Sequence, residues 1–280
     1  MEKRLEQSPK KCFNCGTPIK GEFCHNCGQR VRDNLDRSLG RLLGEFFGNV
    51  FFLDNRFLLS LWFLIRYPAR MTVEFLEGKR KKFISPVTLF LFLNLIYFIV
   101  NPLTDYSLSL YDQTHSQPYS PLIKGMVDKK LQNEGLDQKA YSLVYQNTSN
   151  DMSKSIMILN IPIIALFIYL ITFKKRKFYF DSLIFSFHFF SLFMLSWVLL
   201  DWMGGLIGFF TGDQKSFTTA AVFLLFSFIF PLLYAILGLK KFINVHWYWA
   251  IPAGMGAMIG VGITNLIYRF IIFFVTFWAT

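Results

Sequence analysis

A succession of long apolar segments after residue 83 constrains this chain more than any other feature. A helix of about 18 residues or more is long enough to cross the hydrocarbon core of a bilayer. Apolar residues make up 53% of the chain and charged residues only 17%, against the roughly 25% usual for soluble domains. The chain is therefore predicted to be an all-α membrane protein with about five transmembrane helices. Their approximate bounds are 84–103, 156–173, 182–202, 217–239 and 247–276.

All four cysteines lie near the amino terminus, in the string CFNCGTPIKGEFCHNCGQ. Cys12 and Cys15 form one C-x-x-C pair, and Cys24 and Cys27 form a second after eight intervening residues. Each pair precedes a glycine, and two such turns can direct four thiolates at one ion. A reducing cytosol disfavours disulfides, and an iron site with the same ligands would lack an accompanying redox motif. The spacing predicts a structural zinc ribbon over residues 1–32, with Zn held by the four thiolates.

Residues 33–83 form a juxtamembrane segment with helical periodicity. The string DRSLGRLLGEFFGNVFF, at 36–52, has apolar residues on one side and charged residues on the other, which predicts an amphipathic helix. Arg56–Ile65 is too short to cross a bilayer and is expected to lie half-buried along the cytoplasmic leaflet. A basic run then precedes the first span, and we expect it to bind lipid headgroups at the membrane surface. This run consists of Lys79, Arg80, Lys81 and Lys82.

The uneven distribution of basic residues predicts an orientation. Sixteen of the 29 Lys and Arg precede the first span, and further basic clusters lie at 174–177 and 240–241. The segment 104–155 is polar and contains no Arg. Cytoplasmic loops are enriched in Lys and Arg, and the first 35 residues show no apolar signal-peptide core. We therefore expect a cytosolic amino terminus, a transmembrane bundle over 84–280 with an external loop at 104–155, and an external carboxyl terminus.

Ionisable residues within apolar segments are candidates for functional sites, because burying an unpaired charge in a bilayer is costly. Asp201 and Arg269 both fall near the expected external face and can form an intramembrane polar pair. A structural ion pair is favoured over a part in a permeation or proton path. His188 has no second His or Cys at a suitable spacing, so a packing role is favoured over a proton relay.

Two further strings have a recognisable pattern when taken with the span that follows them. They are CFNCGTPIKGEFCHNCGQR and LDNRFLLSLWFLIRYPARMTVEFLEGKRKKFISP, the latter ending in a G-K-R-x-x-F-x-x-P element. Over about residues 12–100 the chain resembles a family of uncharacterised bacterial membrane proteins that pair an amino-terminal zinc ribbon with a domain of unknown function. The resemblance implies zinc, a membrane domain and a location in the bacterial inner membrane, and it implies no activity.

The sequence contains no recognisable catalytic constellation. It lacks H-E-x-x-H, G-x-S-x-G, a P-loop and a dinucleotide-binding glycine fingerprint after a strand. We expect a protein that is not an enzyme, in which the ribbon is a cytosolic docking or sensing module whose partners are membrane lipids and a cytosolic protein. The alternative is a transporter or a lipid-handling channel. This hypothesis is motivated by the expected kinks in the spans and by the possible pair of Asp201 and Arg269. Binding of nucleic acid by the ribbon is disfavoured, because a ribbon tethered to a membrane meets the phosphates of the lipids first. An oligomer is compatible with the sequence.

Overall fold

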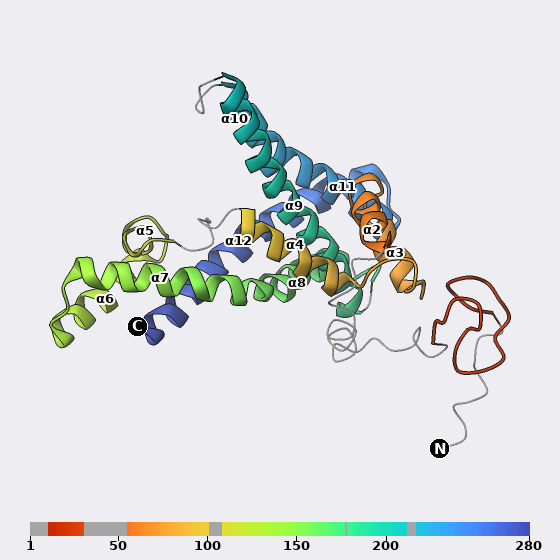
Figure 1. Ribbon diagram of the computed structural model, residues 1–280, viewed down its shortest axis with the longest axis horizontal. Coiled ribbons are helices and arrows are strands. Elements are labelled where there is room, and N and C mark those ends of the chain that lie inside the picture. The colour runs from red at the N-terminus through yellow and green to blue at the C-terminus, as the bar shows by residue number, and fades with distance from the viewer. Residues whose placement is uncertain (1–10, 31–54, 101–107, 177, 212–216) are drawn as a thin grey trace, which may run out of the picture.

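The computed structural model describes residues 11–30, 55–100, 108–176, 178–211 and 217–280 (Figure 1). The amphipathic helix predicted at 36–52 lies outside these ranges. Beyond the cysteine-containing segment, the described chain consists of helices and their connections. They are α2 (Asn55–Arg66), α3 (Arg70–Leu76), α4 (Pro86–Val100), α5 (Leu110–His115), α6 (Ser120–Glu134), α7 (Gln138–Ile156), α8 (Asn160–Thr172), α9 (Tyr179–Thr211), α10 (Phe217–Leu224), α11 (Phe230–Ile243) and α12 (Trp247–Ala279).

Four helical stretches are long and apolar enough to cross a membrane, which confirms a helical fold suited to a bilayer. They are Gln138–Thr172, Tyr179–Phe210, Ala221–Ile243 and Trp247–Ala279. The first predicted span corresponds to α4, which is apolar but has only 15 residues, fewer than the roughly 20 that a perpendicular span needs. A fifth span therefore stays a prediction, since residues 101–107 after α4 lie outside the described ranges.

The centre of the bundle is α9, which packs against α4, α8 and α11. About 78% of its most apolar stretch is buried, compared with 28% for α12. Its rings at Phe185, Phe189 and Phe190 are almost completely enclosed. Phe185 packs 5.0 Å from Phe242 of α11, and Phe190 packs 6.0 Å from Phe90 of α4, measured between ring centroids. An apolar helix suits this position, because its neighbours enclose most of that stretch, whereas Trp202, Phe209 and Phe210 near its carboxyl-terminal end are exposed.

Glycines let α12 approach its neighbours closely. A Cβ atom at Gly254 would lie 2.9 Å from the backbone N and Cα of Ile236 in α11. A Cβ atom at Gly260 would lie 3.0 Å from Cβ of Phe167 in α8, whereas Gly262 has open space around it. Small residues at such positions allow helix backbones to pack in a membrane without the clash that a side chain would introduce.

The segment predicted as a polar external loop, 104–155, is instead largely helical. Its helices α5, α6 and α7 gather around the carboxyl-terminal turns of α12 (Figure 1). A 3-10 turn at Met157–Leu159 continues α7 into α8, so the second predicted span is the end of a longer helical stretch. The shared core of α5–α7 and α12 contains Leu110, Ile123, Val127, Tyr141, Tyr145 and Phe273.

The contacts with α5–α7 explain why the last apolar segment is longer than one membrane span requires. The 33 residues of α12 extend about 50 Å at 1.5 Å per residue, well beyond the hydrocarbon core of about 30 Å. Lys130 of α6 donates a hydrogen bond of 3.1 Å to the carbonyl of Phe277, and the hydroxyls of Tyr141 and Thr280 lie 3.1 Å apart. Side chains of α6 and α7 therefore form hydrogen bonds with groups at the carboxyl-terminal end of α12.

Two prolines coincide with departures from α-helical hydrogen bonding. Pro231 follows a π-helical turn at Leu225–Ile229, and Pro162 follows the 3-10 turn that joins α7 to α8. Proline has no amide hydrogen to donate to the carbonyl four residues earlier, so the regular ladder is interrupted one turn before it. In both cases the irregular turn contains the residue four positions before the proline: Ser227 for Pro231 and Ile158 for Pro162.

Candidate metal centre and juxtamembrane contacts

The cysteines lie on two turns of the same construction. In the first turn, the amide of Cys12 donates to the carbonyl of Thr17, and the amide of Gly16 donates to the carbonyl of Cys12, both over 2.8 Å. The second turn repeats this pattern with Cys24 and Gly28 over 2.9 and 2.8 Å. Each glycine has a positive φ, 75° and 68°, which a residue with a side chain rarely adopts. The glycines after the two C-x-x-C pairs therefore serve to close the turns.

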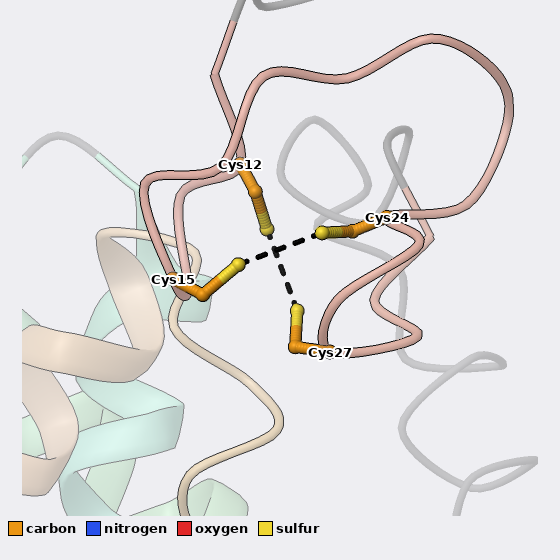
Figure 2. A group of neighbouring side chains, drawn as sticks. All are labelled: Cys12, Cys15, Cys24 and Cys27. Atoms are coloured by element: carbon orange, nitrogen blue, oxygen red, sulfur yellow. Dashed lines mark hydrogen bonds between the residues drawn. The ribbon is translucent and has the colours of Figure 1, made fainter.

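The four sulfur atoms converge on one point (Figure 2). The sulfurs of Cys12 and Cys27 are 3.6 Å apart, those of Cys15 and Cys24 are 3.5 Å apart, and all four lie within 4.8 Å of one another. Zn–S bonds of about 2.3 Å place the sulfurs of a tetrahedral site about 3.8 Å apart. The four cysteines are free thiols, so the geometry fits a tetrahedral metal ion and not a pair of disulfides.

The thiols of the cluster differ in acidity. Burial raises the pKa of Cys27 to about 12, whereas hydrogen bonds with the side chain and backbone of Thr17 lower the pKa of Cys15 to about 6. Four thiolates at these distances repel one another strongly without a positive charge between them. A thiophilic cation removes that repulsion, and the all-sulfur donor set suits such an ion.

Gln29 connects the cysteine-containing segment to the juxtamembrane helices. Its side-chain amide donates a hydrogen bond of 2.6 Å to the carbonyl of Gly78, and its side-chain oxygen accepts one of 3.3 Å from the amide of Arg80. The side chain is only 2% exposed, although Gln29 follows Cys27 by two residues in a small surface segment. Nothing in the sequence distinguishes Gln29 from the other polar residues nearby, so this contact was not predicted.

Glu74 of α3 organises part of the basic run. Its carboxylate accepts hydrogen bonds of 2.8 Å from Lys82 and 2.9 Å from Arg70. Burial would raise the pKa of Glu74, but these two cations outweigh it and hold the pKa below its usual value. Lys82 is thus engaged with a buried carboxylate, in addition to its predicted place at the lipid surface.

The other members of the basic run have different surroundings. Lys79 forms an ion pair of 2.9 Å with Glu77. The guanidinium of Arg80 lies 4.8 Å from the ring centroid of Phe75, while Lys81 is exposed. Binding of lipid headgroups by this run stays a prediction, and Lys81 is the member most open to solvent.

The helix α3 is inserted into the membrane bundle. Thr72 and His188 are both buried, and the hydroxyl of Thr72 lies 2.9 Å from Nδ1 of His188 in α9. Ala69, just before α3, lies within 3.8 Å of the Cβ position of Gly238 in α11. The hydrogen bond to Thr72 supports the packing role predicted for His188.

The predicted pair of Asp201 and Arg269 belongs to α9 and α12. The backbone carbonyl of Arg269 accepts a hydrogen bond of 3.3 Å from Gln113 of α5. Burial raises the pKa of Tyr119 to about 12, against the opposing effect of the positive charge of Arg269. Arg269 is therefore close to the α5–α6 region, and its pairing with Asp201 stays a prediction.

Comparison with known proteins gives one match. Neither the curated proteins nor the solved structures contain a match to this chain. Residues 54–98 match the model of a family described as "Protein of unknown function (DUF3667)". The matched range contains α2, α3, the segment that Gln29 contacts, and most of α4. The similarity is thus confined to the juxtamembrane helices and the apolar helix after them, and it carries no assigned activity.

Proposed function

We propose that this protein is a membrane-anchored docking or sensing module, not an enzyme, in which a structural zinc ribbon contacts the juxtamembrane helices on the cytosolic face. The observation that carries the proposal is the pair of hydrogen bonds in which Gln29 donates to the carbonyl of Gly78 and accepts from the amide of Arg80. These bonds join the segment that holds the metal ligands to the connection between α3 and α4.

A short series of contacts extends from the ribbon to the centre of the bundle. Gly78 follows α3 by two residues, and α3 contacts α9 through the hydrogen bond between Thr72 and His188. A change in the ribbon, whether metal loss or partner binding, therefore acts first on the carboxyl-terminal end of α3. This geometry supports coupling between ribbon and bundle, which a flexible tether would not provide.

Zinc is the metal we assign to the four cysteines. Its preference for tetrahedral sulfur coordination matches the distances between the sulfurs. Four protein ligands fill the coordination sphere and leave no position for a substrate or a reactive water. A structural role for the metal follows from that saturation.

The basic clusters support a cytosolic placement of the ribbon. Arg176, after α8, donates a hydrogen bond of 2.7 Å to the carbonyl of Phe242 near the end of α11. Lys241 borders the same cavity as α3, so the cations at both turns lie at the end of the bundle that carries the juxtamembrane helices. Exposed aromatic rings at Trp247 and Trp249 suit the interface between headgroups and hydrocarbon. In a bacterium this face would be the inner surface of the cytoplasmic membrane.

This orientation can be tested by labelling with a membrane-impermeant maleimide. A Lys124→Cys variant should react in intact cells, because α6 lies with the external carboxyl terminus in the proposed topology. A Lys175→Cys variant should react only after the cells are opened. Labelling of Lys175→Cys in intact cells would contradict the orientation, and the unsubstituted protein controls for reaction of the four native cysteines.

The alternative role, a transporter or lipid-handling channel, requires a polar path through the bundle. Around α9 the space is occupied by aromatic side chains: the ring of Phe90 in α4 lies 5.9 Å from that of Phe187 and 6.0 Å from that of Phe190. This packing supports anchoring over conduction in that part of the bundle.

Replacing Gln29 with alanine should separate the ribbon from the juxtamembrane segment without removing the metal. Loss of the bond to the Arg80 amide should raise the hydrogen-exchange rate of that amide about fivefold, since a hydrogen bond contributes about 1 kcal/mol. Exchange measured by mass spectrometry on peptides covering Gly78–Lys82 checks this, with metal content measured in parallel.

A Glu22→Ala variant provides the matched control, because Glu22 is an exposed residue of the same small segment. It should leave exchange at Arg80 unchanged. Chelation of the metal should increase exchange at Arg80 in the unsubstituted protein and add little in Gln29→Ala. Equal exchange in Gln29→Ala and the unsubstituted protein would contradict the proposed coupling.

A further inference from the structure

A cavity of about 510 Å³ opens where the turn between α2 and α3, the helix α3 and the end of α11 meet. It brings together residues from the segment matched by the family model and from a helix about 170 positions later in the chain. Six of the ten residues that line it are charged, and Leu237 of α11 contributes an apolar edge. The charged residues that line it are Arg66, Arg70, Glu74, Glu77, Lys79 and Lys241.

The acidic groups of this cavity are already neutralised. Glu74 accepts hydrogen bonds from both Arg70 and Lys82, at 2.9 and 2.8 Å. Glu77 is paired with Lys79 at 2.9 Å. These three cations and two carboxylates form a nearly balanced set, so neither carboxylate is left to attract another cation.

Two cations of the wall remain without a carboxylate partner among the described residues. The guanidinium of Arg66 lies 5.6 Å from the ring centroid of Tyr67 and forms no ion pair there. Lys241 is exposed, also lines the cavity, and likewise lacks an acidic partner in the described part of the chain. Two cations that line one cavity without a carboxylate partner among the described residues produce a positive potential that an anion would relieve.

We propose that this cavity binds a phosphate group through Arg66 and Lys241. Guanidinium groups bind phosphate oxygens through paired N–H donors, and a lysine adds a compact positive charge. The group can belong to the headgroup of an anionic lipid or to a free phosphate ion. Leu237 is 41% exposed on a membrane-compatible helix, so the apolar edge of the cavity is open to an acyl chain.

The phosphate site lies beside the contact that holds the ribbon. Lys79 borders the cavity, and the residues on either side of it, Gly78 and Arg80, are those that Gln29 binds through their backbones. The inference extends the proposed function by adding a ligand, and it does not depend on the metal in the ribbon. Its test can therefore fail while the test at Gln29 succeeds.

The experiment uses the purified full chain in a neutral detergent. Dihexanoyl phosphatidylglycerol, inorganic phosphate and dihexanoyl phosphatidylcholine are titrated separately, and dissociation constants are obtained from calorimetry. The Arg66→Gln, Lys241→Gln double variant should bind about 30-fold more weakly, since each cation near a phosphate contributes about 1 kcal/mol. The matched control is Lys174→Gln, Lys175→Gln, which removes two exposed charges from the turn after α8.

The control variant should bind within about twofold of the unsubstituted protein. Tight binding of phosphatidylglycerol alone identifies a lipid headgroup, and equally tight binding of inorganic phosphate identifies a soluble source. Absence of binding by both anions, or an equal loss in the two double variants, would overturn the proposal. If the first double variant fails to purify, the single Lys241→Gln substitution should still weaken binding about fivefold, and an unchanged constant would count against the site.

Discussion

Replacing Cys12 and Cys15 together with serine should abolish metal binding and unfold the ribbon. The described ribbon has only two isolated β-bridges, Lys11 to Pro18 and Phe23 to Arg30, and so has little structure to retain without an ion. Structural zinc in small domains contributes about 10–16 kcal/mol, which is folding free energy when no site exists in the unfolded chain. Metal analysis should therefore fall from one ion per chain to none, and amide exchange over 11–30 should become fast.

A His25→Ala variant is the matched control, because His25 lies between the second pair of cysteines but is exposed. It should keep its metal. Acidification should release the metal from the unsubstituted protein, because protons compete with the ion for the thiolates, so metal occupancy falls as the pH falls. Retention of one tightly bound ion by the double cysteine variant would show that these sulfurs are not its ligands.

The clustering of the four cysteines could be predicted because it depends on local spacing. The two C-x-x-C-G strings specify turns whose glycines adopt positive φ, and eight residues between them let the two turns face each other. The contact of this segment with the rest of the protein could not be predicted in the same way. Gln29 and Gly78 are 49 positions apart, and a single glutamine carries no pattern that indicates its partner.

The membrane class could also be predicted, since apolar length decides it, but the arrangement of the helices could not. Hydropathy does not distinguish a phenylalanine that faces lipid from one that faces protein, so Phe189 in the enclosed α9 and Phe228 on an exposed surface look alike in sequence. The polar composition of 104–155 concealed α5–α7 for a related reason. Their core depends on Tyr145 meeting Phe273, more than 120 positions away.

The basic run shows where a composition rule is incomplete. Cations before a span are common at the membrane surface, so the rule predicts one lipid-binding anchor made of Lys79, Arg80, Lys81 and Lys82. The structure divides them: Lys82 is bound to the buried carboxylate of Glu74, eight positions earlier. Arg66 and Lys241, the cations of the nearby cavity that lack a carboxylate partner among the described residues, are far apart in sequence, and no local pattern groups them.

Replacing Gly254 with valine should destabilise the contact between α11 and α12 by about 3 kcal/mol or more. Even the first carbon of a side chain would meet the backbone N and Cα of Ile236 at 2.9 Å, and a backbone cannot move aside as a flexible side chain can. Overpacking typically costs about 1–3 kcal/mol, and the two further methyl groups of valine enlarge the clash. Thermal unfolding of the purified protein should show a transition that is lower by several degrees.

Gly262 provides the control on the same helix, because no atom lies within 4 Å of its Cβ position. Gly262→Val should therefore change the unfolding temperature little. The two substitutions are matched, because both add the same volume and remove the same backbone freedom. Comparing the two separates helix packing from the general effect of removing a glycine. Equal destabilisation by both would mean that the close approach of α12 to Ile236 does not stabilise the bundle, and that the glycines of this helix act through its backbone instead.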